Sequence, residues 1–183
     1  MNEEEIVPGL LVAMPVLKDS YFEKTVILLC NYTEESAFGL VINTPSTIRI
    51  KDIIASDLEF KNELTDPLLL GGPVQKESLW AIHSDDFSCE STSNVSSSIS
   101  ISAIHEVLGA LARGEGPEKY LLGCGYAGWA PGQLDREIEE GSWWLTSLDT
   151  EYVLDMPYSD RWDAALKKIG IDPLSSFFNT GEF

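Results

Sequence analysis

The stretch GCGYAGWAPGQLDREIEE, residues 123–140, determines how the rest of the chain is interpreted. It follows a short apolar run at 120–122 and gathers glycine and proline around Tyr126 and Trp129. An amphipathic pattern begins near Gln133 and closes at Gly141. The order predicts a strand over 119–122, a glycine-rich turn and a helix. Bare backbone beside aromatic rings at a helix start is typical of a small binding site.

The glycines of this stretch also spell GxGxxG, at Gly123, Gly125 and Gly128. A dinucleotide fingerprint would use such glycines to approach the pyrophosphate, with an acidic residue such as Asp149 about twenty residues further on. The predicted helix does not open at the glycines, however, and Trp129 would crowd the phosphates. The pattern therefore favours a tight turn that packs two aromatic rings, and no cofactor is predicted.

The remaining elements come as runs of strands with a few helices between them. Two apolar runs at 25–30 and 38–43, TVILLC and FGLVIN, are the best candidates for a hairpin. Further strands are expected at 10–14, 68–70, 79–83, 143–146 and 152–154, and helices at 50–55, 104–111 and 160–169. Ser102 and Gly114 are the expected N-cap and stop of the helix at 104–111. Strict β-α-β alternation is lacking, so we expect a mixed α+β domain.

The length of 183 residues suits one domain covering 1–183. Residues 1–8 are expected to form a loose acidic lead. The serine-rich polar segment 85–98 is typical of a flexible loop or linker, and its composition also suits a weak edge strand.

Charge is the strongest compositional signal, because 12 basic residues face 30 acidic ones, for a formal net charge of −18. Such a surface repels phosphate, and the sequence lacks the basic cluster that nucleic-acid binding requires. We therefore expect no direct binding of DNA, RNA or anionic membranes. No apolar run is long enough to span a bilayer, and the acidic start lacks a signal-peptide pattern, so a cytoplasmic location is expected.

The cysteine and histidine side chains form few patterns that are typical of a metal site or a catalytic site. The three cysteines, Cys30, Cys89 and Cys124, form no CxxC pair, so no metal site is predicted. Cys30 is expected to be a buried thiol, and Cys124, in the glycine stretch, is the only cysteine that the sequence suggests as reactive. His83 follows a strand and precedes Ser84 and two aspartates, but whether these groups converge depends on the fold.

Several segments together resemble one bacterial family, known as YqgE/AlgH or UPF0301. They are GLLVAMPVLKDSYFEKTVILLC at 9–30, FGLVINTP at 38–45, GGPV at 71–74, AIHS at 81–84, GYAGWAPGQLDREI at 125–138, SWW at 142–144 and RWDAALKKIGID at 161–172. The resemblance implies one compact domain with a bifurcated or barrel-like sheet flanked by helices. It also implies a bacterial cytoplasmic protein linked to transcriptional regulation, through a family member associated with alginate control, and it implies no settled activity.

The leading hypothesis is a non-catalytic binding or regulatory protein that acts on transcription indirectly, through a small-molecule or protein partner. Turn residues at the ends of family-like segments carry this hypothesis, because loops supply binding residues disproportionately. The candidate pocket residues are Asn43, Pro45, Gly71, Gly72, Pro73, His83, Gly125, Tyr126, Gly128, Trp129 and Gln133. The alternatives are an enzyme, such as a hydrolase that uses Cys124 or His83, and a structural or assembly partner.

Overall fold

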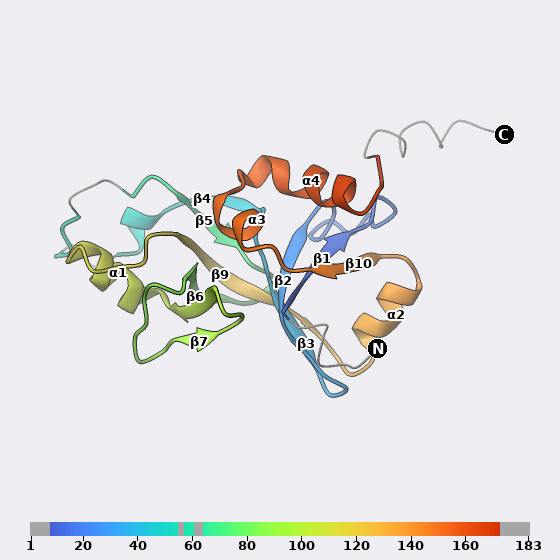
Figure 1. The fold of residues 1–183 in the computed structure, drawn as a ribbon, viewed down its shortest axis with the longest axis horizontal. Helices are drawn as coiled ribbons and strands as arrows, with labels where there is room; N and C mark the ends of the chain where they lie inside the picture. The colour runs from blue at the N-terminus through green and yellow to red at the C-terminus, as the bar shows by residue number, and fades with distance from the viewer. Residues whose placement is uncertain (1–7, 55–56, 61–63, 173–183) are drawn as a thin grey trace.

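Strand β9 (Tyr120–Trp129) runs through the middle of the sheet in this computed structural model, which describes residues 8–54, 57–60 and 64–172. Figure 1 shows it crossing from the half that holds β6 to the half that holds β3. The order across the sheet is β10-β1-β2-β3-β9-β6-β8-β7, and β4 and β5 branch from β9. The fold is therefore a single α+β domain built on one curled sheet.

Neighbouring strands of the sheet are antiparallel, except that β5 lies parallel to β9. The bounds of the other strands are β1 Gly9–Ala13, β2 Val26–Tyr32, β3 Ala37–Val41, β4 Pro45–Arg49, β5 Pro67–Leu70, β6 Val74–Ser84, β7 Ser93–Asn94, β8 Ile99–Ala103 and β10 Trp143–Ser147. The predicted hairpin is confirmed, because β2 and β3 pair directly. The serine-rich segment contributes β7, the strand at the end of the sheet.

The sheet forks at Gly125, which has a left-handed φ of 72°. Before the fork, β9 pairs with β5 through Gly123 and Cys124; after it, β9 pairs with β3 through residues 127–129. Gly71 joins the branches, because its N–H donates to the Cys124 carbonyl and its own carbonyl accepts from Val41 N–H, both at 2.8 Å. Gly125 permits the turn in direction because it has no Cβ.

The part of the chain that the structure describes has four α-helices. They cover different parts of the sheet (Figure 1). Their bounds are α1 Ile104–Ala112, α2 Gln133–Glu139, α3 Thr150–Asp155 and α4 Arg161–Lys168, with 3-10 turns η2 Ile50–Asp52 and η3 Tyr158–Asp160. Helix α4 packs on β1 and β2, α1 on β6 and β8, and α2 on β10.

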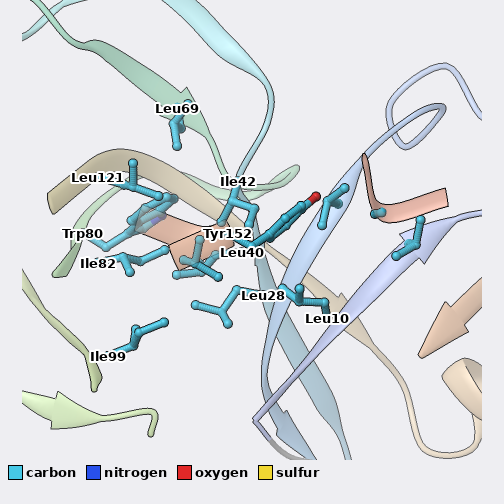
Figure 2. Close-up of a cluster of buried hydrophobic side chains, with 14 of the residues drawn as sticks. Leu10, Leu28, Leu40, Ile42, Leu69, Trp80, Ile82, Ile99, Leu121 and Tyr152 are labelled. Carbon is cyan, nitrogen blue, oxygen red and sulfur yellow. The ribbon is translucent and has the colours of Figure 1, made fainter. Parts of the chain in front are cut away.

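The buried side chains form three clusters, each beneath different helices. The largest joins the sheet to α3 and α4, and Figure 2 shows Trp80 and Tyr152 inside it among aliphatic side chains. A second cluster receives Leu134 from α2, and a third receives Val107 and Leu108 from α1. The amphipathic patterns predicted for α1, α2 and α4 are confirmed by this burial.

Three local predictions are wrong. The expected glycine turn at 123–128 is part of β9, because both edges of this segment find strand partners. The expected strand at 152–154 belongs to helix α3, where Asp149 accepts hydrogen bonds from the N–H groups of Glu151 and Tyr152 as an N-cap. The helix at 50–55 is reduced to η2, and residue 55 lies outside the described residues, as do residues 1–7 of the expected lead.

The cap of α1 also differs from the prediction. Ala103, rather than Ser102, is the N-cap, while Gly114 ends the helix in the left-handed region with a φ of 74° as expected. Ser102 lies in β8 and directs its hydroxyl to His83 instead.

Candidate functional site

A shallow groove of about 600 Å³ lies where β3, β9 and the start of β6 meet. Its lining is mostly apolar and consists of Ser36, Ala37, Phe38, Val74, Tyr126, Gly128 and Trp129. Three of these, Tyr126, Gly128 and Trp129, are among the residues that the sequence analysis proposed.

Strand pairing explains the shape of the groove. Phe38 of β3 faces Gly128 of β9 in register, so no side chain opposes the phenyl ring. The Tyr126 ring, two residues earlier on β9, meets Phe38 edge to face with centroids 6.0 Å apart. Phe38 remains 37% exposed although β3 has a strand partner on each side.

Trp129 forms one wall of the groove but is only 6% exposed. Its Nε1 donates to Glu137 Oε2 at 2.9 Å, and the same oxygen accepts from Trp143 Nε1 at 2.9 Å. Gln133 Nε2 donates to the other oxygen of this carboxylate at 3.0 Å. The Trp129 ring is therefore held in the core by its neighbours and offers only an edge to a ligand.

The other proposed glycines, Gly71, Gly72 and Gly125, do not line the groove and pack against neighbouring backbone. A Cβ on Gly72 would come within 2.0 Å of the Tyr126 carbonyl oxygen, and one on Gly71 within 2.4 Å of the Gly125 oxygen. Because Gly71 and Gly72 have no Cβ, their backbone can lie directly against the backbone of Gly125 and Tyr126. This contact supports the position of Tyr126. Pro73 is exposed beside Val74.

Asn43 and Pro45 have separate structural roles. The Asn43 side chain accepts from Val26 N–H and donates to the Lys24 carbonyl, both at 2.9 Å. Pro45 begins β4 and pairs with Leu69. Neither residue lines the groove. Gln133 does not line it either, and it is linked to the groove only through the Glu137 carboxylate, which accepts hydrogen bonds from both Gln133 and Trp129.

His83 lies apart from the groove and is fully buried in β6. Its Nε2 is 2.7 Å from Ser102 Oγ, and its Nδ1 is 2.8 Å from the Ser84 carbonyl oxygen. Both ring nitrogens are thus engaged within the protein.

The cysteines differ from the expectation about reactivity. Cys124 is 6% exposed, and burial raises the pKa of its thiol. Burial also raises the pKa of the partly buried Cys30 to about 12. Partial burial acts in the same direction on Cys89, but hydrogen bonds with Ser102, Ser91 and Thr92 outweigh it and lower the pKa of this thiol. The sequence analysis missed Cys89, because the hydroxyl groups around it come from two separate segments.

Among residues 8–54, 57–60 and 64–172, no group of three His, Cys, Asp or Glu side chains is arranged to hold a metal ion. In the same ranges, no helix has both the length and the apolar character to cross a membrane.

Comparison with known proteins gives consistent matches along the chain. A family model described as AlgH-like matches residues 10–174. A UPF0301 protein of Photobacterium profundum is 34% identical over 178 residues, covering 93% of this chain and 95% of the relative. A UPF0301 protein of Methylococcus capsulatus is 39% identical over 165 residues, covering 88% of each chain.

Two solved structures have the same fold. The solution structure of the AlgH protein from Pseudomonas aeruginosa has a TM-score of 0.78 at 31% identity, over 100% of this chain and 98% of that one. A crystal structure of a protein from Corynebacterium diphtheriae has a TM-score of 0.72 at 25% identity, over 92% and 90% of the two chains.

Proposed function

This chain belongs to the AlgH-like family of UPF0301 proteins, and from that premise we propose that it is a non-catalytic binding protein. The groove at Phe38, Tyr126 and Trp129 receives an apolar group of a partner. The observation that carries this proposal is the exposed Phe38 ring, which is fixed by Tyr126 and faces Gly128 across a gap. Rigid aromatic side chains around a shallow apolar surface are frequent anchors of protein–protein contacts.

The openness of the groove favours a side chain of a protein partner over an enclosed small molecule. Its lining comes from β3, β9 and Val74 and leaves one side to solvent. Small-molecule sites, by contrast, bury most of the ligand surface. A small molecule remains the second candidate occupant.

Regulation of transcription would then be indirect. The resemblance implies a link to transcriptional regulation through one family member associated with alginate control, and this link motivates a regulatory role. The net charge of −18 opposes contact with a phosphate backbone. The protein would therefore act by binding a regulatory protein partner rather than by contacting DNA.

Site-specific photo-cross-linking in cells tests the proposal. A photo-reactive phenylalanine analogue replaces Phe38 in one strain and Trp144 in another. Trp144 is the matched control, because it is also a large apolar side chain on a strand, is 48% exposed, and lies outside the groove. We expect a discrete protein adduct from position 38 that is missing from position 144, and mass spectrometry then identifies the partner.

Other outcomes are equally informative. An adduct between two copies of this chain would indicate an assembly role in place of a regulatory partner. Indistinguishable products from both positions would contradict a specific docking site. Release of a small molecule on denaturing the purified wild-type protein, with loss of that molecule in Phe38→Ser, would make the small molecule the occupant.

A further inference from the structure

A chain of hydrogen bonds joins the Cys89 thiol to the buried imidazole of His83. Cys89 Sγ lies 3.3 Å from Thr92 Oγ1, which lies 2.8 Å from Ser102 Oγ. Ser102 Oγ lies 2.7 Å from His83 Nε2. Two hydroxyl groups therefore connect a partly exposed thiol to a fully buried base.

The acceptor at the far end sets the direction of every bond in this chain. The Ser84 carbonyl oxygen can only accept, so His83 Nδ1 carries the ring proton and Nε2 is the acceptor. Ser102 then donates to Nε2 and accepts from Thr92. The Thr92 hydroxyl, having donated its own proton to Ser102, accepts from the Cys89 N–H at 2.8 Å and has a second lone pair for the Cys89 thiol, which also contacts the Glu106 carboxylate. A proton that leaves the thiol is thus passed by two hydroxyls to the imidazole.

Hydrogen bonds and charged groups act on both ends of this chain. Asp86 accepts a hydrogen bond from the Ser84 hydroxyl, which is the main cause of a lowered pKa of this carboxyl, and His83 lowers it further. The Asp86 carboxylate therefore lies close enough to the His83 imidazole for the two groups to interact electrostatically. At the other end, hydroxyl hydrogen bonds favour a Cys89 thiolate, as the lowered pKa of this thiol indicates.

The thiol also lines a pocket of about 540 Å³ that extends along α1. Ser91 fixes the Cys89 loop to that helix, because its hydroxyl accepts from Ala103 N–H at 2.9 Å and its N–H donates to Glu106 Oε2 at 3.3 Å. A reactant that enters the pocket therefore meets a positioned sulfur atom.

We propose that Cys89 is a nucleophile that forms mixed disulfides with small disulfides, and that His83 accepts its proton through Thr92 and Ser102. The Cys89 sulfur attacks one sulfur of R–S–S–R, the Cys89–S–S–R bond forms, and the R–S⁻ leaving group departs. The thiol proton resides on His83 and returns to the released thiolate through solvent. No other oxidant is required, because the entering disulfide is reduced as the thiol is oxidised.

The charges of the pocket predict which disulfides react fastest. Three carboxylates line it, from Asp86, Glu106 and Glu115, and its basic groups are Arg113 and His105. Arg113 is already paired with Glu115 at 3.1 Å. The excess of negative charge favours cationic cystamine over neutral hydroxyethyl disulfide, and both of these over anionic glutathione disulfide.

The test measures the rate at which each cysteine of the native protein reacts with cystamine, by peptide mass spectrometry over a range of pH. In the wild type we expect Cys89 to react at least about tenfold faster than Cys30 and Cys124, whose burial raises their pKa values. In Thr92→Val we expect the Cys89 rate at neutral pH to fall about tenfold, with the pH midpoint about one unit higher, because the relay loses its first hydroxyl.

Matched variants separate the relay from general packing. Thr92→Ser keeps the hydroxyl and should react as the wild type does, as should Ser97→Ala, at an exposed serine of the same serine-rich segment that does not line the pocket. Thermal unfolding checks that each variant is folded, and Ser102→Ala replaces Thr92→Val if that variant is not. Equal rates for the three wild-type cysteines would overturn the proposal. So would a pH midpoint of Cys89 that loss of the relay leaves unchanged.

Discussion

The indole Nε1 of Trp80 donates a hydrogen bond of 2.7 Å to the carbonyl oxygen of Gly125 in the buried centre of the sheet. The same ring lies against Gly71 and Gly123, where a Cβ would come within 2.6 Å and 2.2 Å of its Cζ2 atom. The glycines that spell GxGxxG thus make room for an indole ring and a forked sheet. This packing accounts for Gly123 and Gly125 without a nucleotide.

Gly123→Ala should destabilise the protein, because the new methyl group would overlap the Trp80 ring. Overpacking of a buried site costs about 1–3 kcal/mol of unfolding free energy. Urea denaturation measures this loss of unfolding free energy, and Gly128→Ala is the control on the same strand. The added Cβ at Gly128 would meet nothing closer than 3.6 Å, so its change should stay within about 0.5 kcal/mol. Equal midpoints for the two variants would contradict the packing role.

The sequence predicted those parts of the fold that local patterns control. Continuous apolar runs identified the β2–β3 hairpin, and helical spacing identified α1, α2 and α4. It did not predict that β9 continues through its glycines, because the partners that pair with them, β3 and β5, lie far away in sequence. Likewise, Tyr152 and its neighbours form a helix because Asp149 caps it and their apolar side chains meet the core, which outweighs β propensity.

The candidate site was only partly predictable for a related reason. Tyr126 and Trp129 were found from their place beside glycines, but Phe38 reaches the groove through the register between β3 and β9. Cys89 was missed because one of its hydroxyl partners, Ser102, lies on β8, whereas Cys89 lies in the loop before β7. A local signal did exist, since Thr92 follows Cys89 by three residues in a serine-rich segment, but this composition equally suits an ordinary loop.

Arg161 is fully buried, and its guanidinium donates to three backbone carbonyls, those of Ile42, Val153 and Met156. It therefore ties α4 to the chain after β3 and to α3. Arg161→Met should leave these carbonyls without donors and lower the unfolding free energy by at least about 3 kcal/mol. Lys167→Met, an exposed cation on the same helix, should change it by less than about 0.5 kcal/mol. Comparable urea midpoints for both variants would argue against this structural role.

Glu137 accepts hydrogen bonds from the indoles of Trp129 and Trp143 with one carboxylate oxygen. Glu137→Leu should leave two largely buried donors unpaired and cost about 2 kcal/mol or more. The indole N–H resonances of both tryptophans should shift in NMR spectra. Glu139→Leu, at an exposed position of the same helix, should shift neither resonance. Unchanged indole resonances in Glu137→Leu would show that the carboxylate does not hold the Trp129 wall of the groove.

Alkaline pH should destabilise the protein through Cys30. Burial raises the pKa of this thiol from 9.0 to about 12, so the folded protein keeps it neutral while the unfolded chain ionises. Its contribution to stability is therefore complete below pH 9 and is lost as the pH rises toward 12. From Cys30 alone, the unfolding free energy should fall by about 1 kcal/mol per pH unit above pH 9.

Urea denaturation between pH 8 and 11 should show a shallower decline of the unfolding free energy in Cys30→Ala than in the wild type. The same substitution at Cys89, whose pKa is lowered, should not flatten the decline, because a lowered pKa has the opposite sign. Parallel declines in the wild type and Cys30→Ala would mean that the Cys30 thiol ionises as readily in the folded protein as in the unfolded chain.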